Sequence, residues 1–185
     1  MQWIESRKKY QMNAKANNII SELNKVCQRI KKPLTIVETG TIRNSTEAYE
    51  PTDGHSTKYI SEWIRDNEPL TDFYSIDLDT SACLKYMVEL GLIQHVELIQ
   101  SDSRAALVQL INIDFAYLDS GNDAELIMQE FLIVWPKLTR GGCIVIDDCN
   151  TDRADLLKGD LLIPYVIEND LRFNIFNTNQ MVIYK

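Results

Sequence analysis

The sequence has few of the features that mark a flexible, membrane-spanning or secreted chain. Only seven of its 185 residues are glycine and five are proline, so no long flexible linker is expected. No apolar run approaches the roughly 20 residues that cross a bilayer, and the first residues lack the apolar core and cleavage site of a secretory signal. We expect no membrane partner, and one domain over residues 1–185 with a helical extension over residues 1–32.

Positive charge and paired cysteines are also scarce. The net charge is −8, which argues against a nucleic-acid partner, because duplex binding requires clustered lysine and arginine. Basic residues do gather near the start, at Arg7, Lys8, Lys9 and Lys15, where we expect a solvated helix face. The four cysteines form no CxxC pair, so a reducing, cytoplasmic location is expected.

The chain does contain a regular alternation of helix-like and strand-like segments. Apolar residues at helical spacing predict a helix over residues 12–30. Apolar runs predict buried strands at 34–38, 73–77, 96–100, 113–119 and, after a turn at Gly141-Gly142, at 143–147. Four helices are expected between these strands. The first begins at residues 54–57, and the second buries Cys83, Leu84, Met87 and Val88. The third and fourth occupy residues 104–110 and 123–138.

The order of these segments predicts the fold class. Strands that are separated by helices are expected to be parallel and buried on both faces. Residues 172–176 and 181–184 differ, because the short link 177–180 permits only a hairpin and so places one antiparallel strand in the sheet. The prediction is an α/β protein with a doubly wound, mostly parallel, seven-stranded sheet and a C-terminal antiparallel hairpin.

Acidic residues follow the predicted parallel strands at their carboxyl ends. In an open α/β sheet the ligand lies beyond these ends. Like charges at one edge repel, so we expect a ligand with hydroxyls, amines or a metal to meet them. The acidic residues are Glu38, Asp77, Asp102, Asp119, Asp147 and Asp148.

Five short motifs occur in order along the chain. They are Ile36-Val37-Glu38-Thr39-Gly40, Asp53-Gly54-His55-Ser56-Thr57, Ser75-Ile76-Asp77-Leu78-Asp79, residues 113–119 (IDFAYLD) and residues 141–148 (GGCIVIDD). Together with the terminal hairpin, they resemble the class I S-adenosylmethionine-dependent methyltransferases, most closely the branch with catechol O-methyltransferase and the macrocin-type O-methyltransferases. The resemblance covers about residues 35 to 185. It implies a Rossmann-like fold and methyl transfer from S-adenosylmethionine to a hydroxyl of a small molecule.

The resemblance assigns the first motif to the methionine-binding loop. Gly40 would let the backbone approach the cofactor, next to Thr39. Glu38 would accept a hydrogen bond from the cofactor ammonium or order the loop. Residues 41–53 interrupt the glycine-rich turn of the family, and we expect them to form a lid or a substrate loop.

The second motif is expected to begin a helix. Gly54, Ser56 and Thr57 would then offer N–H groups to the carboxylate of the cofactor. Simple helix capping is the alternative role of the two hydroxyls.

Three further residues would bind the adenosine part of the cofactor. Asp77, at the end of the second strand, would accept both ribose hydroxyls, whereas Asp79 suits a turn cap. Asp102 and Ser103 match the position that meets adenine, with capping of the helix that starts near Arg104 as the alternative for Asp102.

Asp119, Asp147 and Asp148 match the positions that bind a divalent metal in the catechol-type branch. Three oxygen ligands on neighbouring strand ends suit Mg²⁺, which would bind the acceptor hydroxyl and lower its pKa. The alternative is that Asp119 only orients the substrate and Asp147 caps the next segment.

The identity of the catalytic base does not follow from the resemblance. The catechol enzymes carry a lysine three residues after the first metal aspartate, and this position is Asn122 here. The candidates, besides Asp119, are His55 and Lys158. A binding or packing role is the alternative for His55, and binding of a substrate anion is the alternative for Lys158.

Other functions remain as alternatives. Asp77-Leu78-Asp79-Thr80 imitates the strand-end motif of haloacid-dehalogenase-like phosphatases, although its threonine comes one place too early. A nicotinamide dehydrogenase would carry GxGxxG after the first strand, which is absent. A non-catalytic S-adenosylmethionine-binding protein is the third alternative. The methyl acceptor and the oligomeric state are left open, with a homodimer as one candidate.

Overall fold

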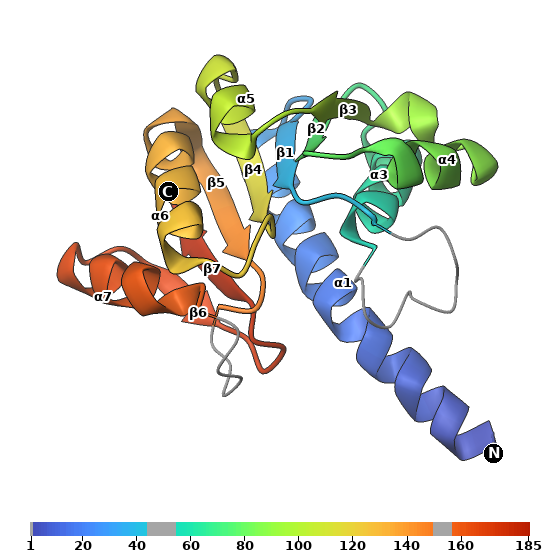
Figure 1. The fold of residues 1–185 in the computed structure, drawn as a ribbon, viewed down its shortest axis with the longest axis horizontal. Coiled ribbons are helices and arrows are strands. Elements are labelled where there is room, and N and C mark those ends of the chain that lie inside the picture. Colours follow the sequence, from blue (N-terminus) through green and yellow to red (C-terminus); the bar gives the residue numbers. More distant parts are fainter. Residues whose placement is uncertain (1, 44–54, 150–156) are drawn as a thin grey trace.

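Seven strands form one sheet in the order β3-β2-β1-β4-β5-β7-β6 in the computed structural model (Figure 1). Strands β1 to β5 are parallel, and β7 pairs antiparallel with both β5 and β6. The structure describes residues 2–43, 55–149 and 157–185, with side chains from residue 14 onward. The predicted fold class and the terminal hairpin are confirmed.

The elements alternate along the chain as the apolar pattern predicts, with small shifts of their bounds. No helix in the described part of the chain is long and apolar enough to span a membrane. The elements are α1 Gln2–Ile30, β1 Thr35–Thr39, α3 Ser56–Asn67, β2 Asp72–Asp77, α4 Ser81–Glu89, the 3-10 turn Ile93–His95, β3 Glu97–Gln100, α5 Ser103–Gln109, β4 Ile113–Leu118, α6 Ala124–Val134, the 3-10 turn Trp135–Lys137, β5 Leu138–Ile146, α7 Gly159–Glu168, β6 Phe173–Ile175 and β7 Met181–Tyr184.

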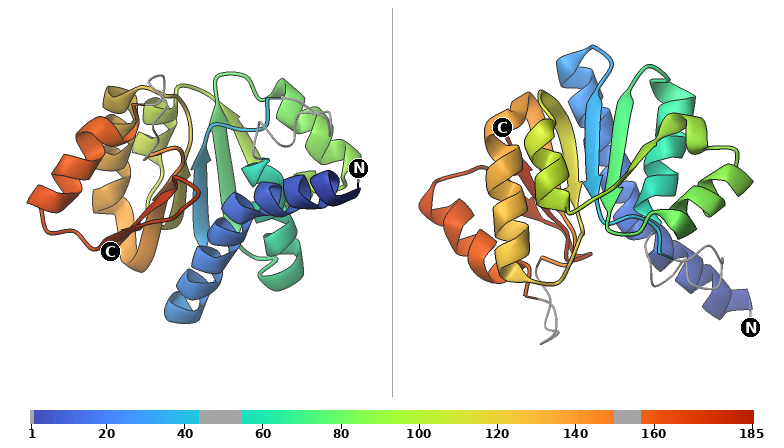
Figure 2. Two further views of the ribbon diagram at one scale, coloured as in Figure 1. Left: turned by 90° about the horizontal axis from the view of Figure 1, so that it is seen from below. Right: turned by 45° about the horizontal axis from the view of Figure 1, so that its top comes forward.

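Helices cover both faces of the sheet (Figure 2). On one face, Ile19, Leu23 and Val26 of α1 and the apolar side of α3 pack against β1, β4, β5 and β7. On the other face, the apolar sides of α5, α6 and α7 pack against alternate residues of the same strands. All six residues of the central strand β4 are therefore buried, as expected for a parallel strand between two helical layers.

Helix α4 lies beside β3 at one edge of the sheet and is buried on a narrower side than its sequence predicts (Figure 1). Cys83 and Met87 are buried with Tyr86, but Leu84 and Val88 are 48% and 56% exposed, so their predicted burial is wrong. Among the described residues, the helix packs into a small cluster that includes Ile42 and Leu92.

Strand β5 begins at Leu138, earlier than predicted, and Gly141-Gly142 lies inside it rather than in a turn before it. A Cβ on Gly142 would overlap the backbone carbonyl of Asp114 on β4. Glycine is therefore needed here for the close approach of two strands, and the pairing shifts register at this point. The N-terminal helix expected within residues 1–32 is α1, which begins at Gln2 and so extends beyond the apolar pattern at residues 12–30, whereas α7 was not predicted.

Candidate active site

The parallel strands β1 to β5 end at one edge of the sheet, hereafter the carboxyl edge. The chain order reverses between the neighbouring strands β1 and β4, and ligands of open α/β sheets bind at such a switch point. A cavity of about 150 Å³ lies there, and its lining includes Gly40 after β1, Asp77 after β2, Ser103 at the start of α5 and Ser120 after β4. Ligand pockets are commonly roughly 300 Å³ or more, so this cavity suits one part of a nucleoside-containing ligand.

Gly40 joins β1 to this cavity in a conformation that requires glycine. Its φ is +83°, and a Cβ would overlap the backbone carbonyl of Asp119. Backbone hydrogen bonds hold it in place: the Gly40 N–H donates to Ile76 at 2.9 Å, and the Asp119 N–H donates to Thr39 at 2.8 Å. The ends of β1, β2 and β4 are thus drawn together, and the backbone beside the cavity stays free of side-chain bulk.

Asp77 lies between the cavity and the loop that follows β1. Its Oδ2 accepts from the Thr41 N–H at 2.8 Å, and its Oδ1 accepts from the Leu78 N–H at 2.7 Å. Carboxylate oxygens carry two lone pairs each, so the group can accept further hydrogen bonds on its cavity side. Asp79, in contrast, is exposed and accepts the Ser81 N–H at 2.9 Å, which is the predicted turn cap.

Glu38 is fully buried and receives hydroxyl donors from two neighbouring elements. Thr57 of α3 donates to Oε2 at 2.6 Å, Ser75 of β2 donates to it at 2.5 Å, and Ser56 also contributes. Burial raises the pKa of Glu38 to about 7, although the three hydroxyls oppose the rise. These contacts join the end of β1 to α3 and β2, and they turn the hydroxyls of Ser56 and Thr57 toward Glu38 instead of a helix cap. The contact of Glu38 with the cofactor ammonium stays a prediction.

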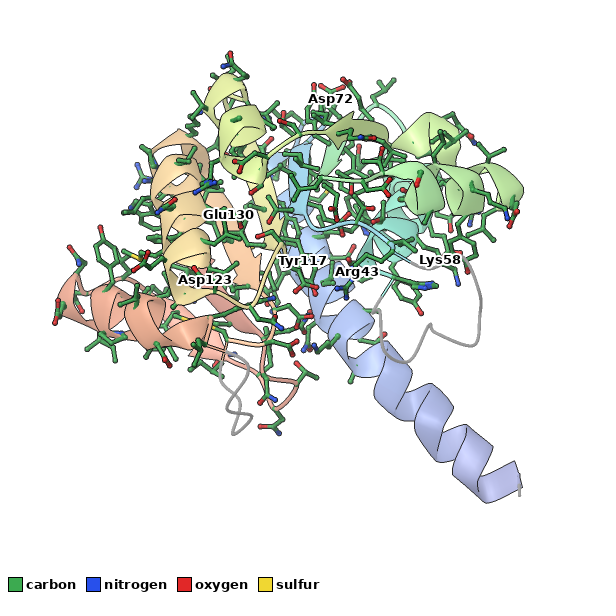
Figure 3. All side chains as sticks on the ribbon, in the orientation of Figure 1. Arg43, Lys58, Asp72, Tyr117, Asp123 and Glu130 are labelled. Carbon is green, nitrogen blue, oxygen red and sulfur yellow. The ribbon has the colours of Figure 1, made fainter. Side chains whose placement is uncertain are left out.

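Glu130 of α6 is a buried carboxylate that the sequence analysis missed. Figure 3 shows it between α6 and the sheet, where its Oε2 accepts from Thr39 at 3.0 Å. Burial raises the pKa of Glu130, and the hydroxyls of Ser103 and Ser120 oppose that rise. One carboxylate therefore lies against three elements that line the cavity. The signal was present, because Glu130 follows Ile127 by three positions and so falls on the buried face.

Asp102 caps α5, which was its alternative role. Its carboxylate accepts from the Arg104 N–H at 3.0 Å and pairs with the Arg104 side chain at 2.7 Å. The hydrogen bonds with Arg104 lower the pKa of Asp102 to about 2. Asp102 and Ser103 both line the cavity, so the predicted contact with adenine stays a prediction that their position allows.

Asp119, after β4, meets Lys158, which comes just before α7. Lys158 is 1% exposed and donates to the Asp119 carboxylate, which is 32% exposed. Partial burial and the neighbouring Asp147 raise the pKa of Asp119, while Lys158 opposes the rise. Of the two candidate bases beyond Asp119, the structure brings only this lysine to it. His55 is fully buried, and its ring packs edge-on against Tyr86 of α4 at 5.1 Å, which is the packing alternative.

Asp147 and Asp148, after β5, meet Lys15 of α1. The Lys15 Nζ lies 2.8 Å from the carboxylates of both residues. Burial alone would lower the pKa of Lys15, but the two carboxylates raise it overall. The prediction that Lys15 lies on a solvated helix face is therefore wrong. Arg7, Lys8 and Lys9 lie outside the described side chains, and Gly54 lies outside the described residues.

A second cavity, of about 200 Å³, lies at the amino ends of β2 and β3. Its lining includes Asp72, Tyr74, His95 and Glu97. This is the edge of the sheet opposite to Asp77 and Asp119. The smaller cavity at the carboxyl edge is therefore the better candidate for the active site.

Comparisons with known proteins identify the family of the chain. The family model of a methyltransferase domain matches residues 52–149, more than half of the chain. The chain belongs to this methyltransferase family. A search of the curated proteins finds no match to the methyltransferase.

The methyltransferase shares its fold with solved structures at low sequence identity. CalS11, a TDP-rhamnose 3'-O-methyltransferase of calicheamicin biosynthesis, is 17% identical with a TM-score of 0.63 over 91% of this chain and 79% of that one. The O-methyltransferase NovP is 13% identical with a TM-score of 0.70 over 92% and 79%. MycE of the mycinamycin pathway, solved with Mg and S-adenosylhomocysteine, is 14% identical with a TM-score of 0.63 over 89% and 48%.

The family membership makes S-adenosylmethionine the methyl donor of this methyltransferase. The residues at the carboxyl edge fit that ligand on two observations. Gly40 keeps the backbone beside the cavity clear, and Asp77 faces the cavity with lone pairs that ribose hydroxyls can use.

The three carboxylates that the resemblance assigns to a divalent metal do not fit that role, because lysines already pair with them. These carboxylates, on Asp119, Asp147 and Asp148, are paired with Lys158 and Lys15. Across the described ranges, no group of three or more His, Cys, Asp and Glu side chains is arranged to hold a metal ion. The reaction is therefore derived below from the protein's own side chains.

Proposed function

We propose that this methyltransferase transfers the methyl group of S-adenosylmethionine to a hydroxyl of a small molecule. The adenosine part of the donor would occupy the cavity between Gly40, Asp77 and Asp102, and the acceptor would lie at Asp119. The prediction of a metal-assisted reaction is not carried further, since lysines pair with the carboxylates it requires.

The observation that carries the proposal is the position of Asp119. Its backbone is hydrogen-bonded to Thr39 and packed against Gly40, so it lies directly beside the donor loop. Its side chain is nevertheless about one-third exposed, at 32%, and so remains accessible to an acceptor. Donor and acceptor would thus meet across one short stretch of backbone, and methyl transfer depends mainly on such positioning.

The protein's own groups can orient the acceptor and receive its proton. Lys158, held almost without exposure, fixes the carboxylate of Asp119 by an ion pair. Asp119 would accept a hydrogen bond from the acceptor hydroxyl and take its proton as the oxygen becomes bonded to the methyl carbon. Bound S-adenosylmethionine supplies the methyl group and leaves as S-adenosylhomocysteine. His55 has no role in this proposal, because its ring packs on Tyr86.

Two observations support a small acceptor. CalS11 acts on a TDP-linked sugar, as its name states, and NovP is an O-methyltransferase. The net charge of −8 disfavours a nucleic-acid acceptor.

Binding of S-adenosylhomocysteine tests the donor site. We expect it to raise the melting temperature of the wild-type protein, and we expect Asp77→Ala to weaken the binding at least tenfold in calorimetric titration. Asp79→Ala is the matched control, because Asp79 is exposed and caps a turn two residues away. Its affinity should stay within about twofold of wild type, since a lost exposed cap affects the helix rather than the ligand.

The same titrations can contradict the proposal. If S-adenosylhomocysteine does not bind the wild-type protein, the donor site is wrong. If Asp77→Ala binds it as tightly as wild type, Asp77 does not hold the ribose. Transfer of labelled methyl groups to a panel of sugar nucleotides and catechols then identifies the acceptor class, and transfer only to RNA or protein would refute the small-molecule assignment.

A further inference from the structure

Lys15 of α1 occupies the space between the two carboxylates that follow β5. Its Nζ lies 2.8 Å from Asp147 and 2.8 Å from Asp148, which is the length of a charge-assisted hydrogen bond. The Asp147 side chain is only 6% exposed, so the lysine meets it in a largely desolvated position. A positive φ of 47° at Asp148 turns the chain at this point, and its N–H donates to Asp147 at 2.9 Å.

The position of Lys15 is fixed by the residues that follow it on α1. Ala16 and Ile19 are buried in the core, at 5% and 1% exposure. Asn18, three positions after Lys15, donates to Thr178 at 2.8 Å and to Gln180 at 2.9 Å, which ties the same part of α1 to the turn before β7. The part of α1 that carries Lys15 is therefore held in place by packing and hydrogen bonds, and this fixes the position of Lys15 beside the carboxylates.

Asp119, the third carboxylate of the predicted metal set, is also paired with a lysine. This lysine is Lys158, which is almost completely buried. A cation placed among the three carboxylates would meet two ammonium groups, and like charges at such short range repel. A divalent ion could use Asp147 and Asp148 as ligands only if Lys15 moved away.

We propose that the ammonium group of Lys15 takes the place of a divalent cation at the acceptor side of this methyltransferase. While Lys15 is present, Asp147 and Asp148 do not bind a metal, and removal of its charge exposes a latent metal site. The inference rests on the proposed function only in assigning these residues to the acceptor side, because the metal binding itself requires neither donor nor acceptor.

Binding of Mn²⁺ to the full chain tests the proposal, with the free ion measured by electron paramagnetic resonance. Wild type and Lys15→Arg should show no saturable site that depends on Asp147. Lys15→Met should bind one Mn²⁺ per chain at least tenfold more tightly than wild type, and the double variant Lys15→Met/Asp147→Asn should lose this binding. Lys25→Met is the matched control on the same helix, because Lys25 pairs with Glu22 at 2.7 Å in another part of the fold. It should gain no binding.

The outcomes that overturn the proposal are specific. A wild-type site with one Mn²⁺ per chain that Asp147→Asn abolishes would show that the lysine does not replace the metal. Absence of any gain in Lys15→Met would show that the carboxylates are not a latent site. Lys15→Gln provides a second neutral variant if Lys15→Met does not melt cooperatively, and the same gain is required of it. The thermal shift with S-adenosylhomocysteine on these samples reports the donor site separately, so failure of the proposed function can be distinguished.

Discussion

The buried carboxylate of Glu38 makes the stability of the protein depend on pH in a way that can be measured. Glu38 has no exposed surface and accepts hydroxyl donors from Thr57 and Ser75. Glu38→Gln keeps the shape and one oxygen acceptor but removes the charge. The difference between wild type and this variant therefore isolates the cost of ionising a buried acid.

The magnitude follows from the pKa. Burial raises the pKa of Glu38 from 4.5 to about 7, and a change of this size corresponds to about 3 kcal/mol. Below pH 4.5 the carboxyl is protonated in both the folded and the unfolded protein, so no free energy of unfolding is lost to ionising it. Between pH 4.5 and about 7 the unfolded protein ionises Glu38 more readily than the folded protein does, so the free energy of unfolding falls, and the loss is complete once the pH has risen through about 7.

Urea unfolding of wild type and Glu38→Gln at several pH values between 5 and 8.5 measures the effect. We expect the free energy of unfolding of wild type to fall relative to the variant by about 2 to 3 kcal/mol over this range. Ser75→Ala removes a donor that favours the ionised form, so it should move the transition to higher pH. A difference between wild type and Glu38→Gln that stays constant from pH 5 to 8.5 would refute the reasoning.

Two further predictions concern stability at opposite edges of the sheet, measured by thermal and urea unfolding. Gly40→Ala should lower the free energy of unfolding by about 2 to 4 kcal/mol and weaken S-adenosylhomocysteine binding, because the added Cβ would overlap the Asp119 carbonyl. Gly91→Ala is the control, because Gly91 has a φ of +65° but its Cβ would meet no atom within 4 Å. It should lower the free energy of unfolding by only about 1 kcal/mol and leave binding unchanged. Asp114→Ala should cost about 2 to 4 kcal/mol, because this fully buried carboxylate accepts three hydrogen bonds, whereas Asp72→Ala at an exposed position of the same edge should cost less than about 0.5 kcal/mol. Equal losses in the members of either pair would contradict the structural argument.

The fold could be predicted because its parallel strands are recognisable in the sequence as apolar runs between helices. The run at residues 113–119 has no interruption, and β4 is buried along its whole length. Gly141 and Gly142 led to the wrong start of β5, because glycine most often marks a turn. The reason for Gly142 is the carbonyl of Asp114 on the neighbouring strand, and sequence reasoning has no access to that contact.

Burial on α4 was overestimated for a related reason. Helical spacing identifies an apolar side, but it does not say how wide a surface covers that side. Leu84 and Val88 fall at the margin of a helix at the edge of the sheet, and they are exposed there.

The acidic residues of the candidate site were found from their positions after strands, whereas the ion pairs of Asp119, Asp147 and Asp148 with lysines were not predicted. Asp119 and Asp147 lie at the carboxyl edge because parallel strands end together. Lys15 is 132 positions from Asp147 along the chain, and only the packing of α1 brings the two together. Glu130 could have been found, since its spacing from Ile127 places an acid on the buried face of α6.

The position of α1 constrains how the chain can fold during synthesis. This helix precedes every strand of the sheet in the sequence, yet its buried residues, such as Leu23 and Val26, pack with Cys143, Val145 and Val182, which come much later. The hydrogen bonds of Asn18 likewise require Thr178 and Gln180, which come near the end of this sequence. The contacts of α1 with β5 and β7 can therefore form only after those late strands have been synthesised, whereas its contacts with β1 and α3 can form earlier.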